Sequence, residues 1–171
     1  MWDKIECLTS KNVNVKKYIF TKEDAIAEAV LYKYPTYEDR TVMCISTQTG
    51  CPMGCTFCGT GKFFGRNLTS EEITSQVTYM LGSNDINLVE CASAQIMVMS
   101  MGEPVLNSKE LTAAFHEFHR DYPNAALLIS TSGPKSKRGW KDINKLSVDI
   151  DKVGLQFSIH ESTDDARNKL I

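Results

Sequence analysis

The chain has 171 residues, of which 42% are hydrophobic and 23% charged, and its net charge is −2. This length allows one domain with a proper core but not two ordinary domains, and the composition is that of a globular protein. No apolar run approaches the roughly 18 residues of a membrane span, and the first residues lack a signal-peptide pattern, so we expect a cytoplasmic protein with no membrane partner. The net charge gives no general attraction for nucleic acid, so any RNA binding must rest on local patches.

The first predicted elements are two short strands, residues 16–20 and 26–32, joined by a polar turn into a hairpin. After Pro35 the pattern changes to strands that alternate with helices. We therefore expect two parts, an N-terminal β-hairpin extension over residues 1–36 and a core over residues 37–171.

The core is predicted to contain four strand–helix units. Thr69 with Glu72 forms a capping box before the first helix, and Asn107 with Glu110 is the corresponding pair before the second. Apolar residues then recur at helical spacing in each helix. The strands are predicted at 42–46, 95–100, 125–130 and 153–160, and the helices at about 70–81, 108–118, 141–146 and from 164 onward.

This alternation predicts an α/β fold of parallel strands joined by right-handed crossovers, in which the loops after the strands carry the chemistry. The fourth strand alternates apolar Leu155 and Phe157 with polar Gln156 and Ser158. A purely structural parallel strand is apolar on both faces. The polar face therefore indicates the interior of a barrel, or of part of one, that holds a ligand.

The most informative motif is CPMGCTFC at 51–58, directly after the first predicted core strand. The thiols of Cys51, Cys55 and Cys58 can wrap one metal centre. A structural zinc site needs four protein ligands, and no fourth is obvious nearby. A [4Fe-4S] cluster on three cysteines leaves one iron open for a cofactor. The spacing, with an aromatic residue before the last cysteine, resembles the signature of radical S-adenosylmethionine (SAM) enzymes, and zinc is the alternative.

Motifs after the later strands resemble the SAM site of these enzymes. The run GEP at 102–104 follows the second strand, where a glycine lets the backbone approach the methionyl amino group. Its alternative is a simple turn, and the alternative for His160 is a hydrogen-bonded structural histidine. The resemblance implies that the residues in contact with SAM are Gly102, Glu103, Ser130, Ser158, Ile159 and His160.

The run CISTQTGC at 44–51 resembles the segment before the cluster in radical SAM methyltransferases of 23S rRNA and tRNA, which methylate an adenosine at C2 or C8. The runs at 59–62, 66–69 and 158–167 fit the continuation of that family in order. The resemblance implies an RNA methyltransferase with a [4Fe-4S] cluster and SAM as cofactors. It also implies rRNA or tRNA as substrate and an electron-donor protein such as flavodoxin or ferredoxin.

In this family one SAM methylates a second catalytic cysteine near the C-terminus, and another SAM yields a 5′-deoxyadenosyl radical that takes hydrogen from that methyl group. Cys44 matches the thiol that resolves the resulting protein–RNA adduct, and its alternative is a small buried residue. Glu28 best matches the carboxylate near the nucleobase. A solvated glutamate on a strand is the alternative for Glu28.

The sequence departs from the family at both ends. The resemblance implies six strand–helix units, a second catalytic cysteine and an N-terminal helical domain, so the C-terminal strands and that domain are expected to be missing. Cys7 and Cys91 are interpreted as structural. An open parallel edge would recruit another chain or aggregate. Two alternatives to the methyltransferase follow: another radical SAM enzyme, such as a glycyl-radical activating enzyme, or a non-catalytic remnant that binds the cluster.

The stretch KSKRGWK at 135–141 is the best candidate for contact with RNA. Its basic side chains would contact phosphates while Trp140 stacks on a base. The alternative is a solvated basic loop with Trp140 packed into the core.

Overall fold

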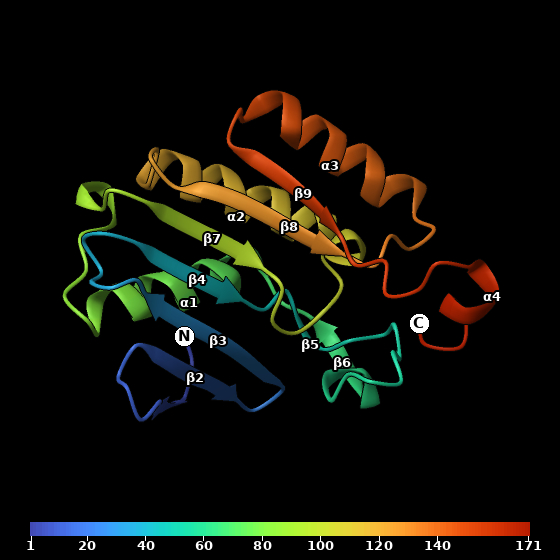
Figure 1. Ribbon diagram of the computed structural model, residues 1–171, viewed down its shortest axis with the longest axis horizontal. Helices are drawn as coiled ribbons and strands as arrows, with labels where there is room; N and C mark the ends of the chain where they lie inside the picture. The colour runs from blue at the N-terminus through green and yellow to red at the C-terminus, as the bar shows by residue number, and fades with distance from the viewer.

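The computed structural model describes all 171 residues, and its centre is a seven-stranded mixed sheet (Figure 1). The strands of this sheet are β1 (Lys4–Thr9), β2 (Val15–Lys22), β3 (Ala25–Lys33), β4 (Thr41–Ile45), β7 (Ala94–Val98), β8 (Ala126–Thr131) and β9 (Val153–Phe157). They lie in the order β1-β2-β3-β4-β7-β8-β9. The first four are antiparallel neighbours, and β4, β7, β8 and β9 are parallel.

A second sheet of two strands and four helices complete the fold. The small sheet pairs β5 (Gln48–Gly50) with β6 (Phe64–Asn67). The helices are α1 (Ser70–Gly82), α2 (Ser108–Asp121), α3 (Lys137–Asp149) and α4 (Asp164–Arg167), with short 3-10 turns at Thr60–Lys62, Leu88–Glu90 and Pro104–Asn107. None of the helices has the length and apolar character needed to cross a membrane.

The predicted N-terminal hairpin is confirmed as β2 and β3, and a strand that was not predicted, β1, pairs with β2. Ala25, Ala27, Ala29 and Leu31 of β3 alternate with less buried residues, which is the period of a strand with one buried face. Because β3 pairs with β4, these strands extend the sheet of the core. The domain boundary near residue 36 stays a prediction.

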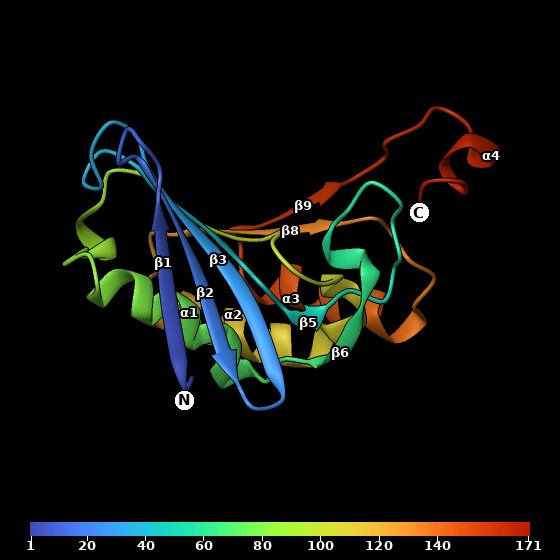
Figure 2. The same ribbon diagram turned by 90° about the horizontal axis from the view of Figure 1, so that it is seen from below.

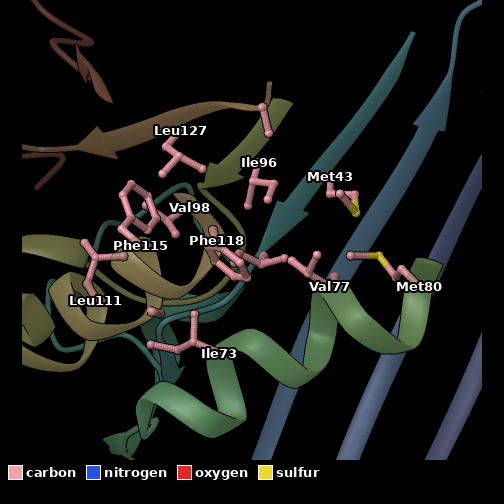
Figure 3. Packing of buried hydrophobic residues seen from close by; sticks show 14 of the residues in the cluster. Met43, Ile73, Val77, Met80, Ile96, Val98, Leu111, Phe115, Phe118 and Leu127 are labelled. Carbon is pink, nitrogen blue, oxygen red and sulfur yellow. The ribbon is translucent and has the colours of Figure 1, made fainter. Parts of the chain in front are cut away.

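Helices α1, α2 and α3 lie on one side of the large sheet, and none of them lies against the opposite side (Figure 2). Right-handed crossovers between parallel strands place successive helices on the same side. Close packing of α1 and α2 against β4, β7 and β8 makes the centre of the core (Figure 3). Its fully buried members include Met43, Ile73, Val77, Ile96, Leu111, Phe115, Phe118 and Leu127.

Alternate residues of the same strands face the uncovered side. Cys44 pairs with Met97 in the register of β4 and β7, and Met97 pairs with Leu128 of β8. Met97, Leu128 and Ser130 are partly exposed, whereas their neighbours in each strand are buried. The predicted α/β class with parallel strands is therefore confirmed. Strands β1 and β9 each pair on one side only, so the sheet is open and its closure into a barrel stays a prediction.

The two predicted helix caps have different outcomes. The capping box is confirmed, because Thr69 Oγ1 accepts a hydrogen bond from Glu72 N at 3.3 Å and Glu72 Oε2 accepts one from Thr69 N at 2.9 Å. Asn107 precedes α2 but makes no side-chain cap. Its Nδ2 instead donates to the carbonyls of Thr47 and Leu68, at 2.7 and 2.9 Å. The side-chain amide of Asn107 therefore joins two loops and does not cap the helix.

Other predicted bounds also differ from the structure, most clearly in two elements. Helix α3 begins at Lys137, four residues before the predicted start, because Ser136 Oγ accepts a hydrogen bond from Gly139 N at 3.1 Å. The last strand ends at Phe157 rather than at residue 160. Beyond it, His160 has a φ of +64°, which an extended strand does not allow.

Candidate functional site

The three cysteines lie in a loop that leaves β5 and returns through β6, beside the carboxyl ends of the parallel strands. The base of this loop is narrow. Cys51 N donates to Phe63 O at 2.9 Å, and Gly50 has a φ of +75°. A Cβ atom at Gly50 would lie 2.2 Å from Phe63 O, so only glycine fits there. The loop is therefore closed by its own backbone before any ligand binds.

Cys51, Cys55 and Cys58 are partly exposed and form no disulfide. Burial raises the pKa of Cys51, and the nearby charges of Cys55 and Glu103 raise it further. Deprotonated thiolates here would repel one another, and a cationic iron–sulfur centre would relieve that repulsion. The donor set therefore fits a cluster held by three thiolates. No group of three or more His, Cys, Asp or Glu side chains, these three thiols included, is gathered closely enough to hold a metal ion.

Gly102 follows β7 in a conformation and a space that only glycine tolerates. Its φ is +103°, and an added Cβ would lie 2.8 Å from both Thr47 Oγ1 and Gln48 Cβ. The hydroxyl of Thr47 is buried there without a hydrogen-bond partner. Glycine is therefore needed here so that the turn can pack against the β4–β5 connection, and the contact between Gly102 and SAM stays a prediction.

The carboxylate of Glu103 is buried and fully used within the chain. Oε2 accepts hydrogen bonds from Ser132 N and Ser132 Oγ, both at 2.9 Å. Oε1 accepts from Thr131 Oγ1 and from Val105 N. The side chain thus joins the turn after β7 to the end of β8.

The remaining predicted SAM residues lie at the ends of β8 and β9. Ser130 pairs in register with Gln156, on the side of the sheet that the helices leave uncovered. Ser158 N donates to Thr131 O at 2.8 Å, which holds the chain beyond β9 against β8. The ring of His160 packs on Phe57 of the cysteine loop, with 4.6 Å between centroids. Ile159 is 63% exposed.

Cys44 and Glu28 lie on neighbouring strands of the uncovered face. Val30 is the cross-strand partner of Cys44, and Glu28 lies two residues before Val30, so the two side chains are diagonal neighbours. Ser46 Oγ bonds both to Glu28 N and to Glu28 O, at 3.1 and 2.6 Å. The Glu28 carboxylate pairs with Lys17 Nζ at 2.8 Å. The structure thus brings the two predicted catalytic residues together.

The environment of Cys44 sets its protonation. The thiol is 8% exposed, and burial raises its pKa to about 11. Its sulfur therefore carries a proton at neutral pH. A thiol that is buried yet faces the uncovered side agrees with both sequence interpretations, the packed residue and the resolving thiol.

The prediction that Trp140 stacks on a base is not supported, and the packed alternative is. The indole N–H donates to Pro134 O at 2.9 Å, and the ring stacks on Phe157 with 5.7 Å between centroids. The ring also packs against the hydrophobic core. The basic residues of the stretch remain exposed: Lys135, Lys137, Arg138 and Lys141.

Comparison with curated proteins gives one consistent result. The chain is 35% identical over 164 residues to the dual-specificity RNA methyltransferase RlmN of Syntrophotalea carbinolica, covering 91% of this chain and 40% of that protein. It is 35% identical over 173 residues to the probable RlmN of Thermus thermophilus, covering 98% and 46%. It is 38% identical over 159 residues to that of Trichodesmium erythraeum, covering 91% and 42%.

The chain resembles the RlmN RNA methyltransferases over almost its entire length. This resemblance was predicted from the cysteine motif and the runs around it, and it is confirmed. The chain spans less than half the length of these relatives. No family model matches it.

Sequence reasoning missed an ion-pair network beside the site. Arg66, which leads out of the cysteine loop, pairs through both sides of its guanidinium, with Asp24 at 2.7 Å and with Glu72 at 2.7 Å. Lys22 Nζ also lies 2.7 Å from the Glu72 carboxylate. Hydrogen bonds from Arg66 lower the pKa of Glu72 to about 2. The network connects the N-terminal strands to the base of the cysteine loop and to α1. It was missed because the sequence does not show that the end of β2 and the turn after it, with Lys22 and Asp24, lie beside Arg66 and Glu72.

Proposed function

We propose that this chain is the cluster-binding and cofactor-binding part of a radical SAM methyltransferase that modifies an adenine carbon, C2 or C8, of rRNA or tRNA. One observation carries the proposal. Three free thiols lie in one closed loop at the carboxyl ends of parallel strands, in a chain that resembles RNA methyltransferases over 91–98% of its length. That edge of a parallel sheet is where α/β proteins bind their ligands.

In this proposal Cys51, Cys55 and Cys58 would hold a [4Fe-4S] cluster. When bound, the cluster supplies the electron that cleaves SAM. The residues of this chain position the cofactor. Gly102 lets the turn after β7 pack against Thr47 and Gln48, and the hydrogen bonds of Glu103 fix the neighbouring strand ends. The proposed contacts with SAM are Gly102, Glu103, Ser130, Ser158, Ile159 and His160.

Cys44 and Glu28 would act on the nucleobase. The raised pKa of Cys44, about 11, keeps the proton on Sγ until the thiol is needed. Glu28 lies on the same face and is held by Lys17 at 2.8 Å, so its carboxylate is placed to exchange a proton near the substrate. The buried thiol must lose this proton before it can act as a nucleophile.

The proposal extends to the architecture and the partners. Strands β4, β7, β8 and β9 would be the first four of a β/α barrel, with an extension over residues 1–36 beside it. RNA would approach the uncovered face. A small electron-transfer protein such as flavodoxin or ferredoxin would reduce the cluster.

A second candidate is a protein that binds the cluster and SAM but does not transfer a methyl group by itself. The remaining thiols favour it. Cys7 is exposed on the outer strand β1, and Cys91 is buried before the amino end of β7, bonded to Thr41 Oγ1 and Asn87 O. Neither lies at the carboxyl edge, where a second catalytic thiol would be needed. The test for methylated RNA described below separates the two candidates, because both of them bind the cluster and SAM.

The first test is anaerobic reconstitution with iron and sulfide, followed by EPR of the reduced protein before and after addition of SAM. A reduced-cluster signal that shifts with SAM is expected for the chain and for the control variant Cys91→Ser, and it should be absent from Cys55→Ser. Zinc binding, or a signal indifferent to SAM, would contradict the proposal. Mass spectrometry of rRNA and tRNA fragments after turnover then tests for a methyl group on an adenine carbon.

A further inference from the structure

The chain beyond β9 returns to the cysteine loop, although more than a hundred residues separate the two in sequence. Thr56 N donates to Leu170 O at 2.8 Å, and Thr56 Oγ1 lies 3.5 Å from the same carbonyl. Both ribbon views place the C-terminal end next to the loop between β5 and β6 (Figures 1 and 2). We call residues 159–171 the return segment.

Arg167 holds the return segment in place. Its Nε donates to Ile159 O at 3.2 Å, and its Nη2 donates to Ser132 O. One planar guanidinium thus joins the chain after β8 to the chain after β9. Leu170 N donates in turn to Arg167 O at 2.9 Å, so the position of Arg167 decides where the Leu170 carbonyl lies.

The return segment contacts the loop at two neighbouring residues. Thr56 is held by Leu170, and Phe57 is held by the ring of His160. Both lie between Cys55 and Cys58. A change at Arg167 therefore reaches the loop through these two contacts.

We propose that Arg167 is a positioning residue for the cysteine loop: its bonds to the Ser132 and Ile159 carbonyls hold the return segment against Thr56 and Phe57 and limit solvent access to the cluster site. This inference deepens the proposed function and rests on it for its meaning. The arrangement itself is a property of the metal-free chain. It can therefore be tested without iron, SAM or RNA.

The test compares alkylation rates of each thiol by iodoacetamide, mapped by mass spectrometry, in the metal-free protein and in Arg167→Ala. We expect Cys55 to react at least about fivefold faster in the variant, because both charge-assisted hydrogen bonds of the guanidinium are lost and the open population rises. Amide hydrogen exchange over residues 51–63 should accelerate as well. Arg120→Ala is the matched control, because Arg120 is exposed on α2 and pairs with the adjacent Asp121; this variant should change neither rate.

Arg167→Lys keeps the charge but has a single ammonium in place of the fork, so it should restore less than half of the protection. Full protection in Arg167→Lys would overturn the role of the two carbonyls. An unchanged Cys55 rate in Arg167→Ala would overturn the proposal. Faster alkylation of the buried Cys91 to the same extent would also overturn it, because that result would mean global unfolding.

The outcomes separate this inference from the proposed function. In the reconstituted protein, Arg167→Ala should lose its cluster absorbance in air several-fold faster than the parent chain. If the parent binds no cluster yet Arg167→Ala exposes Cys55, the positioning role holds and the proposed function fails. If the cluster forms and responds to SAM while Arg167→Ala leaves both the thiol rates and the air sensitivity unchanged, the function holds and the positioning role fails.

Discussion

The two faces of the large sheet are built from the same strands but have different environments. Met43, Ile96 and Leu127 point into the helix-covered face and are inaccessible to solvent. Their neighbours on the uncovered face, such as Met97 and Ser130, are partly exposed. A strand alternates its side chains, so each strand contributes both to the core and to the candidate site. Adjacent residues of one strand therefore serve different purposes, one in the core and the next in the candidate site. Substitutions on the covered face should mainly change stability, and those on the uncovered face should mainly change the site.

The largest effect is expected from the covered face. Phe115→Ala should lower the free energy of unfolding by about 3–5 kcal/mol, because it leaves a cavity among fully buried side chains. Met97→Ala, on the uncovered face, should cost about 1 kcal/mol, because its side chain is already partly in water. Urea unfolding followed by circular dichroism measures both. Equal losses would mean that the uncovered face is as much a core as the other.

The Gly102→Ala variant tests whether the turn after β7, at the edge of the uncovered face, requires the backbone conformation that only glycine adopts easily. Gly102→Ala should cost about 2–4 kcal/mol, since alanine is strained at a φ of +103° and its Cβ would clash with Thr47 and Gln48. The matched control is Gly82→Ala at the end of α1, where an added Cβ meets nothing within 4 Å. That variant should be neutral or stabilised by up to about 1 kcal/mol. A harmless Gly102→Ala would argue against the close approach described here.

The contribution of the ion-pair network to stability, at the rim of the covered face, can be tested by changing the pH. The pKa of Glu72 is lowered from 4.5 to about 2 in the folded chain, so its contribution to stability is complete above pH 4.5 and is lost as the pH falls toward 2. Thermal unfolding between pH 7 and pH 2 should show this decline, and Glu72→Gln should flatten it. Glu38→Gln, at an exposed residue without an ion pair, is the control and should leave the pH dependence unchanged.

Cys44 is expected to give the smallest change in stability and a clear chemical one. Cys44→Ala should cost about 1 kcal/mol, since only one sulfur atom is removed from a residue at the edge of the core. With a pKa of about 11, alkylation of Cys44 should rise about tenfold for each pH unit between 7 and 10. Mass spectrometry resolves this thiol from the exposed Cys7. A rate that levels off below pH 9 would contradict the buried environment.

Much of the parallel part of the fold was predictable because apolar runs and helical stripes alternate there. The edge strand β1 was missed because its residues are mostly exposed and carry no buried face. The small sheet β5–β6 was missed because it depends on the close backbone approach at Gly50 rather than on apolar side chains. A local sequence pattern reveals buried apolar side chains, and these elements offer few: β1 is mostly exposed, and β5 buries the polar Gln48 and Thr49.

For the candidate site, the sequence indicated which residues would gather but not how each would be used. Glu103 was correctly placed after β7, yet its carboxylate bonds to Thr131 and Ser132, which only the adjacency of β7 and β8 reveals. For Trp140 the sequence left two interpretations open, base stacking or packing into the core, and only the adjacency of α3 and β9 shows that the ring packs on Phe157. Pairings between distant segments are not written in any local pattern.

The order of strands in the sheet also has a consequence for folding kinetics. Strands β1 to β4 are consecutive neighbours joined by short turns, so their pairing closes only small loops. The pairing of β4 with β7, by contrast, joins residues such as Cys44 and Met97 across the whole cysteine loop and α1. Because contacts between distant residues form more slowly, the antiparallel strands should gain hydrogen-exchange protection first and provide the template on which the parallel strands, and with them the thiol loop, are later assembled.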